Sequence, residues 1–205
     1  MERVSGAELA ERLAPAAQRW EVDLDATLPG LALFSSLLLE WGAHVNLTGA
    51  HSLAELCAAH LADAFPLMPL LPPSGEWIDV GSGAGLPGIV IAIARPNLRG
   101  VLLEPNQKRR AFLKTAIRAL RSDLTVLGER LEDHAARVGA VYAVAISRAV
   151  FPLPTWCRSG GPLVRPGGAL IGFASAESSR DAPSESEVIP YDVGAGPRAI
   201  VRVRM

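Results

Sequence analysis

The sequence predicts an α/β protein with a parallel sheet, helices on both faces of that sheet and a helical extension at the N-terminus. Two observations support this fold class. From Glu76 onward, short apolar runs alternate with helical segments of about ten residues, and strands that alternate with such helices form parallel sheets with right-handed crossovers. Before Glu76, apolar residues recur at the spacing of helices.

Residues 1–72 are expected to form the helical extension and residues 73–205 the core. Apolar residues three or four positions apart predict helices over Leu9–Ala17, Leu33–Trp41 and Leu53–Phe65. Ser52 and Glu55 have the spacing of a capping box, so the third helix should begin there. Prolines in residues 69–75 end the helices and indicate a linker.

The core is expected to alternate strands with helices. Expected strands are Trp77–Val80, Val101–Glu104, Thr125–Leu127, Val141–Ile146 and Ala169–Phe173. Expected helices are Leu86–Ala94, Asn106–Arg121, Leu131–Arg137 and residues 151–160. We also expect a turn at Arg165–Gly168 and a mobile loop over residues 174–186. In the tail, Val201 and Val203 alternate with arginines, which predicts a terminal antiparallel hairpin.

The composition excludes several classes of protein. The 205 residues are 49% hydrophobic and 20% charged, which is typical of a globular chain. We find no run of about 20 lipid-facing residues and no signal-peptide pattern at the start, so no membrane partner is expected. The two cysteines lie far apart, and no cysteine–histidine cluster has zinc-site spacing. A cytoplasmic monomer without metal is therefore expected.

A glycine-rich loop directly follows the first expected strand of the core. Gly83, Gly85 and Gly88 satisfy the pattern G-x-G-x-x-G. Glycine lets the backbone approach a ligand closely, and the helix that follows offers N–H groups to a carboxylate or phosphate. Glu104 follows Gly85 by 19 residues, at the end of the next strand, where Rossmann-like folds place the acid that binds ribose hydroxyls.

The loop alone does not identify the nucleotide-type ligand. A typical NAD dehydrogenase needs a longer chain, and the Tyr-x-x-x-Lys pair of compact dehydrogenases is absent because Ile146 stands four residues after Tyr142. The phosphate-loop pattern of NTPases is absent as well. S-adenosylmethionine is therefore the favoured cofactor, with its carboxylate at the loop and its ribose at Glu104. The fold class is then a Rossmann-like class I methyltransferase sheet.

Several motifs resemble one methyltransferase family. The segment Trp77–Ile89, with its Gly-Leu-Pro-Gly element, is similar to the loop of the glucose-inhibited division protein B (RsmG) family, and so is Ile146–Ala149. His60 with Asp63 and the pair Lys108-Arg109 also agree in order. The resemblance covers about residues 30–175. It implies transfer of a methyl group to N7 of a guanine in bacterial 16S ribosomal RNA.

The resemblance also implies site residues. Residues expected to contact S-adenosylmethionine are Gly81, Leu86, Leu131, Glu132 and Arg148, beside Gly83, Gly85 and Glu104 from the loop pattern. Arg148 is expected to orient the cofactor or the guanine, because N7 has a free lone pair and no general base is needed. The chain departs from the family where Gly172–Ser175 lacks a lysine. This departure leaves two alternatives open: a small-molecule methyltransferase, or a decayed protein that binds the cofactor without transfer.

The charge distribution points to RNA although the net charge does not. The formal net charge is −1, which argues against an overall cationic protein. Eight basic residues nevertheless lie between Arg95 and Arg121, and the only acid among them is Glu104. The expected RNA-binding residues are Lys108, Arg109, Arg110, Lys114 and Arg118. The expected partner is 16S ribosomal RNA or an early small-subunit particle.

Overall fold

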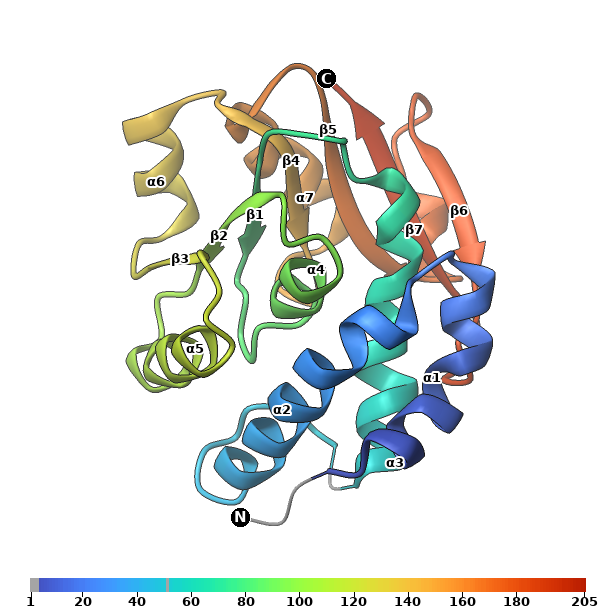
Figure 1. Ribbon diagram of the computed structural model, residues 1–205. Coiled ribbons are helices and arrows are strands. Elements are labelled where there is room, and N and C mark those ends of the chain that lie inside the picture. Colours follow the sequence, from blue (N-terminus) through green and yellow to red (C-terminus); the bar gives the residue numbers. More distant parts are fainter. Residues whose placement is uncertain (1–3, 51) are drawn as a thin grey trace.

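A computed structural model describes residues 4–50 and 52–205 (Figure 1). Within this part of the chain the strands form a 7-stranded sheet in the order β3-β2-β1-β4-β5-β7-β6. The strands are β1 (Glu76–Val80), β2 (Arg99–Leu103), β3 (Thr125–Leu127), β4 (Tyr142–Ser147), β5 (Val164–Ser175), β6 (Glu187–Tyr191) and β7 (Arg198–Arg204). The pairs from β3 to β5 are parallel, whereas β7 is antiparallel to both β5 and β6. The α/β fold class is thus confirmed.

Helices cover both faces of the sheet (Figure 1). They are α1 (Gly6–Arg19), α2 (Leu24–Gly42), α3 (Leu53–Leu56), α4 (Gly88–Ala94), α5 (Gln107–Ala119), α6 (Leu131–Val138) and α7 (Leu153–Gly160). Alternation along β1 separates the two faces. Trp77 belongs to the apolar cluster shared with α1, α2, α4 and α5, whereas Ile78 and Val80 belong to the cluster shared with α6 and α7.

The predicted third helix is longer and less regular than expected. Ser52 accepts a hydrogen bond from the Glu55 amide at 3.2 Å and so caps α3, as predicted. The helix then widens into a π-helix, Cys57–Leu61, and tightens into a 3₁₀-helix, Ala62–Leu70. The two prolines inside the last segment lack N–H donors, so regular α-helical bonding cannot continue there.

The same segment is long and apolar enough to cross a membrane. Leu53–Leu70 meets the length and hydropathy of a span, which differs from the expectation that no such run exists. Yet 56% of this segment is buried inside the protein. Phe65 and Leu67 are fully buried in the cluster that also contains Trp77. Packing against the core therefore accounts for its apolar character.

Two expectations about the C-terminal part are wrong in detail. The turn Arg165–Gly168 interrupts β5 rather than preceding it: Val164 pairs with Tyr142, and pairing resumes between Ala169 and Val144. The expected loop 174–186 is partly structured, because β5 continues to Ser175 and a 3₁₀-helix spans Ser178–Asp181. The terminal hairpin is present, and its strand β7 joins the sheet edge at β5. Residues 1–3 and His51 of the expected extension lie outside the described residues.

Candidate functional site

The glycine loop lies where the order of the sheet reverses. β1 pairs with β2 on one side and with β4 on the other, and ligands of such sheets bind beyond the carboxyl ends of the strands at this point. Gly81 has a φ of +73°, and a Cβ atom there would lie 2.4 Å from Val150. Only glycine meets both requirements at this position. The backbone after β1 is therefore shaped for close approach.

Glu104 ties the loop to the end of β2. Its carboxylate accepts a hydrogen bond from the Gly83 amide at 2.8 Å and another from the Asn106 amide at 2.8 Å. The side chain is only 4% exposed. Each carboxylate oxygen can accept a second hydrogen bond, so the group can still receive the two hydroxyls of a ribose. The expected pairing of loop and acid is present in space.

Two cavities meet at Gly81 and Val150. The first, which we call the loop cavity, has a volume of about 180 Å³, and its lining includes Gly83, Leu86 and Arg148. The second, the strand cavity, has a volume of about 210 Å³ and is lined in part by Leu131 and Glu132. Gly81 and Val150 are common to the linings of both cavities. Gly85 does not line either cavity; a Cβ there would lie 2.5 Å from Ile89 Cδ1, so this glycine serves helix packing.

Arg148 belongs to a partly buried ionic cluster. Its Nη1 donates to Asp63 Oδ2 at 2.7 Å, and its Nη2 lies 3.0 Å from His60 Nδ1. Arg198 Nη1 reaches the same Asp63 oxygen at 2.8 Å, and the Tyr191 hydroxyl donates to Asp63 Oδ1 at 2.7 Å. Asp63 is fully buried. The helical extension thus supplies the carboxylate that fixes a strand-end arginine.

Histidine in this cluster is neutral near pH 7. Burial, followed by the nearby charge of Arg148, lowers the pKa of His60 to about 4. A neutral ring can accept the hydrogen bond from Arg148 at Nδ1, which leaves the proton on Nε2. His60 therefore orients the guanidinium and contributes no charge of its own.

A third hollow lies next to the loop cavity. This arginine cleft has a volume of about 490 Å³, and its lining includes His60, Asp63, Arg148, Phe173 and Arg198. It shares Arg148, His60 and Ala149 with the loop cavity. A ligand in the loop cavity and a second molecule in the arginine cleft would therefore be neighbours at Arg148.

Asp79 lies buried beneath the glycine loop. Its Oδ2 accepts a hydrogen bond from the Gly88 amide at 3.1 Å, and its own carbonyl accepts one from the Ser82 hydroxyl at 2.7 Å. Burial raises the pKa of Asp79 to about 7. This carboxyl holds the turn between β1 and α4.

We expect the titration of Asp79 to lower the free energy of unfolding as the pH rises from about 4 to about 7. The folded state keeps a proton that the unfolded chain releases at lower pH, so rising pH favours unfolding. Asp79→Asn removes this titration and should stabilise the protein relative to wild type by on the order of 2 kcal/mol more at pH 8 than at pH 5. Urea unfolding at both pH values measures the difference. Equal effects at the two pH values would contradict the assignment.

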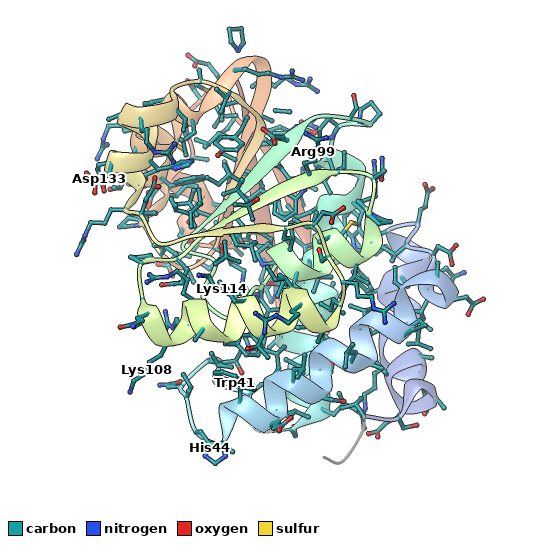
Figure 2. The ribbon with its side chains drawn as sticks, turned by 60° about the vertical axis from the view of Figure 1, so that its left-hand side comes forward. Trp41, His44, Arg99, Lys108, Lys114 and Asp133 are labelled. Carbon is teal, nitrogen blue, oxygen red and sulfur yellow. The ribbon has the colours of Figure 1, made fainter. Side chains whose placement is uncertain are left out.

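The basic residues of α5 divide into two groups. Lys108, Lys114 and Arg118 are exposed, and Figure 2 labels the two lysines on α5. Arg109 is half-buried and lines the loop cavity. Arg110 has a structural task that the sequence did not predict: its Nη1 donates to the carbonyls of Pro105 at 2.9 Å and Glu104 at 3.3 Å. Its guanidinium thus holds the turn after β2.

Sequence reasoning missed part of the site. Tyr191 and Arg198 come from the terminal hairpin, and nothing in their local pattern links them to Asp63. The sequence identifies His60 and Asp63 only as two positions that agree with the family resemblance, and it predicts no role for either residue. Within the described residues, no group of three or more histidine, cysteine or acidic side chains could hold a metal ion.

The sheet order, the glycine loop and the acid at the end of β2 define a class I methyltransferase. Solved structures support the fold: a Corynebacterium glutamicum protein aligns with a TM-score of 0.56 at 17% identity, covering 85% of this chain and 90% of that one. A precorrin-6y C5,15-methyltransferase from Geobacter metallireducens aligns with a TM-score of 0.50 at 14% identity, covering 64% and 81%.

The sequence comparisons identify the family. Residues 28–194 match the family GidB, described as rRNA small subunit methyltransferase G. The chain is 36% identical over 183 residues to the ribosomal RNA small subunit methyltransferase G of Acidiphilium cryptum, covering 84% of this chain and 82% of the relative. It is 35% identical over 191 residues to that of Thermobifida fusca, covering 87% and 80%. The chain belongs to this methyltransferase family.

Proposed function

We propose that this enzyme transfers the methyl group of S-adenosylmethionine to N7 of a guanine in 16S ribosomal RNA. The observation that carries this proposal is the meeting of the loop cavity and the arginine cleft at Arg148. A cofactor held along the glycine loop by Gly81, Gly83 and Glu104 would supply a methyl group next to the arginine cleft. The RNA substrate follows from family membership.

The residues present fit S-adenosylmethionine. The backbone at Gly81 has no room for a side chain, and Glu104 offers a buried carboxylate to ribose hydroxyls. Leu131 and Glu132 line the strand cavity, where apolar contact and a polar edge suit an adenine. When bound, the cofactor supplies an electrophilic sulfonium methyl group.

The protein acts by positioning. Guanine N7 carries a lone pair and needs no deprotonation, so neutral His60 and ion-paired Asp63 are not required as bases. Holding two reactants in line can lower a barrier by ~7–11 kcal/mol in favourable cases. Arg148, fixed by Asp63 and His60, orients the groups that meet at the junction of the two hollows.

Labelled S-adenosylmethionine and small-subunit RNA from a strain that lacks the modification test this function. Label should appear at guanine N7 of the RNA. An active family member serves as the control. Cofactor binding without transfer to RNA would instead support a decayed protein, and transfer only to small molecules would support the other alternative.

Arg148→Ala should lower kcat/KM for RNA by about tenfold or more, the value of one charge-assisted hydrogen bond. Arg198 still neutralises Asp63 in this variant, so the fold should persist. Steady-state methylation with a thermal-unfolding control measures the effect. Wild-type kcat/KM in a folded variant would refute the orienting role.

The exposed face of α5 is proposed to track RNA phosphates. Lys108→Glu or Lys114→Glu should each raise the Kd for RNA several-fold and make the salt dependence shallower, because each removes a phosphate contact. The Kd for S-adenosylmethionine should not change. Arg165→Glu, the same change of charge at an exposed residue in the turn that interrupts β5, is the matched control. If Arg165→Glu weakens RNA binding as much as the lysine variants do, the loss of affinity comes from the change in net charge and not from the exposed face of α5.

We further propose that residues 4–50 and 52–72 pack on the core 73–205 as one unit and that the protein acts as a cytoplasmic monomer. One apolar cluster contains Leu13 and Phe34 of the extension together with Trp77 and Ile146 of the sheet. The ribosomal RNA of the family's printed name supports the cytoplasmic location. Sedimentation of the purified chain checks the monomer.

A further inference from the structure

The arginine cleft has a deep part and an outer part. Arg148, whose side chain is 15% exposed, lines both the cleft and the loop cavity. Arg198, whose side chain is 31% exposed, lines the cleft but not the loop cavity. Its neighbours in the lining include Pro197 and Ser178, both on segments that lead to the protein surface. Arg198 therefore lines a part of the cleft that the loop cavity does not share.

The cleft carries an unbalanced positive charge. Both guanidinium groups share one carboxylate oxygen, Asp63 Oδ2, and no other acidic residue lines the cleft in the described part of the chain. His60 is neutral and does not alter the sum. Two cations against one anion leave one positive charge, held in a partly buried place where it is screened less than at the surface.

Arg198 also keeps unused hydrogen-bond donors. Its Nη1 serves Asp63 and the Ala59 carbonyl. For its Nε and Nη2, no partner is found among residues 4–50 and 52–205. A guanidinium with a free edge can hold an anionic oxygen, and phosphate is the group that matches this fork in RNA. Arg148, in contrast, spends both Nη atoms on Asp63 and His60.

We propose that Arg198 binds a backbone phosphate of the acceptor RNA at the outer part of the arginine cleft. This inference rests on the proposed function and adds a residue to it. With a phosphate fixed there, the attached nucleotide can extend its base past Phe173 toward Arg148 and the loop cavity. Asp63 binds both arginines and so sets the distance between the phosphate contact at Arg198 and the nucleotide contact at Arg148.

Arg198→Ala and Arg198→Lys test the proposal with an unmethylated 16S RNA transcript. We expect Arg198→Ala to raise the Kd for RNA about tenfold and to reduce the slope of log Kd against log salt by about one. Arg198→Lys keeps the charge and should retain the slope. The Kd for S-adenosylmethionine should stay within about twofold of wild type in both variants, because Arg198 does not line the loop cavity. Arg204→Ala, which removes an exposed cation from the same strand, is the control.

A wild-type salt slope in folded Arg198→Ala would overturn the phosphate contact. A salt slope that is reduced equally in Arg198→Lys would also overturn it, because the charge at this position would then not account for the slope. Failure of the proposed function looks different: wild-type enzyme would then transfer no methyl group to RNA. RNA binding and its salt slope are measured without transfer, so they still decide the role of Arg198.

Discussion

Glu104→Ala should raise the Kd for S-adenosylmethionine about 100-fold. The carboxylate accepts hydrogen bonds from the Gly83 and Asn106 amides, so it shapes the loop in addition to its proposed role of receiving the ribose. Hydrogen bonds to a charged group contribute ~1.5–3 kcal/mol each, and a 100-fold change corresponds to ~2.7 kcal/mol. Isothermal titration calorimetry measures the loss directly.

Two further variants sharpen this test. Glu104→Gln keeps one acceptor oxygen and should fall between wild type and alanine. Glu76→Ala removes an exposed carboxylate at the opposite end of β1 and should bind the cofactor normally. A folded Glu104→Ala protein with a Kd within threefold of wild type would mean that the ribose does not lie at this acid.

Asp63→Ala should lower the free energy of unfolding by about 3 kcal/mol. Removing one partner of a buried ion pair typically costs 3–5 kcal/mol, and the partial exposure of the two arginines reduces the penalty toward the lower value. Tyr191 loses its acceptor in the same variant. For a chain of 205 residues this corresponds to a drop in Tm of roughly 6–12 °C.

Calorimetric unfolding of Asp63→Ala and Asp63→Asn separates the contribution of the negative charge to stability from that of the side chain's size and hydrogen bonds. The asparagine variant keeps acceptors for Tyr191 and one arginine and should lose less stability. Asp123→Ala, at an exposed position, should stay within about 0.5 kcal/mol of wild type. If Asp63→Ala unfolds no earlier than Asp123→Ala, the cluster does not stabilise the fold.

The sequence predicts those parts of the site that depend on local order. Gly81, Gly83 and Glu104 follow buried strands, and strand ends meet at one edge of a parallel sheet. The same reasoning placed Arg148 at that edge after β4. It could not give Arg148 its partners, because Asp63 lies 85 positions earlier in the chain.

The missed residues depend on long-range packing. Tyr191 meets Asp63 across 128 positions, and only the insertion of β7 next to β5 brings this about. The alternating valines and arginines in the tail predict a hairpin, but they do not predict that its strand β7 pairs with β5. The lysine that the family resemblance expects near Ala174 is missing, whereas Arg198 stands opposite the adjacent Ser175 in the sheet register. A cation thus reaches the same sheet edge from another strand.

The π-helix Cys57–Leu61 makes the position of Asp63 depend on the number of residues between α3 and Asp63 more than on which residues they are. A π turn contains one residue more than an α turn, and the extra residue rotates everything that follows it. Deleting a residue such as Ala58 would restore α spacing and turn the next segment by about 100° relative to α3. The deletion would then move Asp63 away from Arg148 and Arg198, although every functional side chain would still be present. Substitutions of half-buried Ala58 should be tolerated where a one-residue deletion is not.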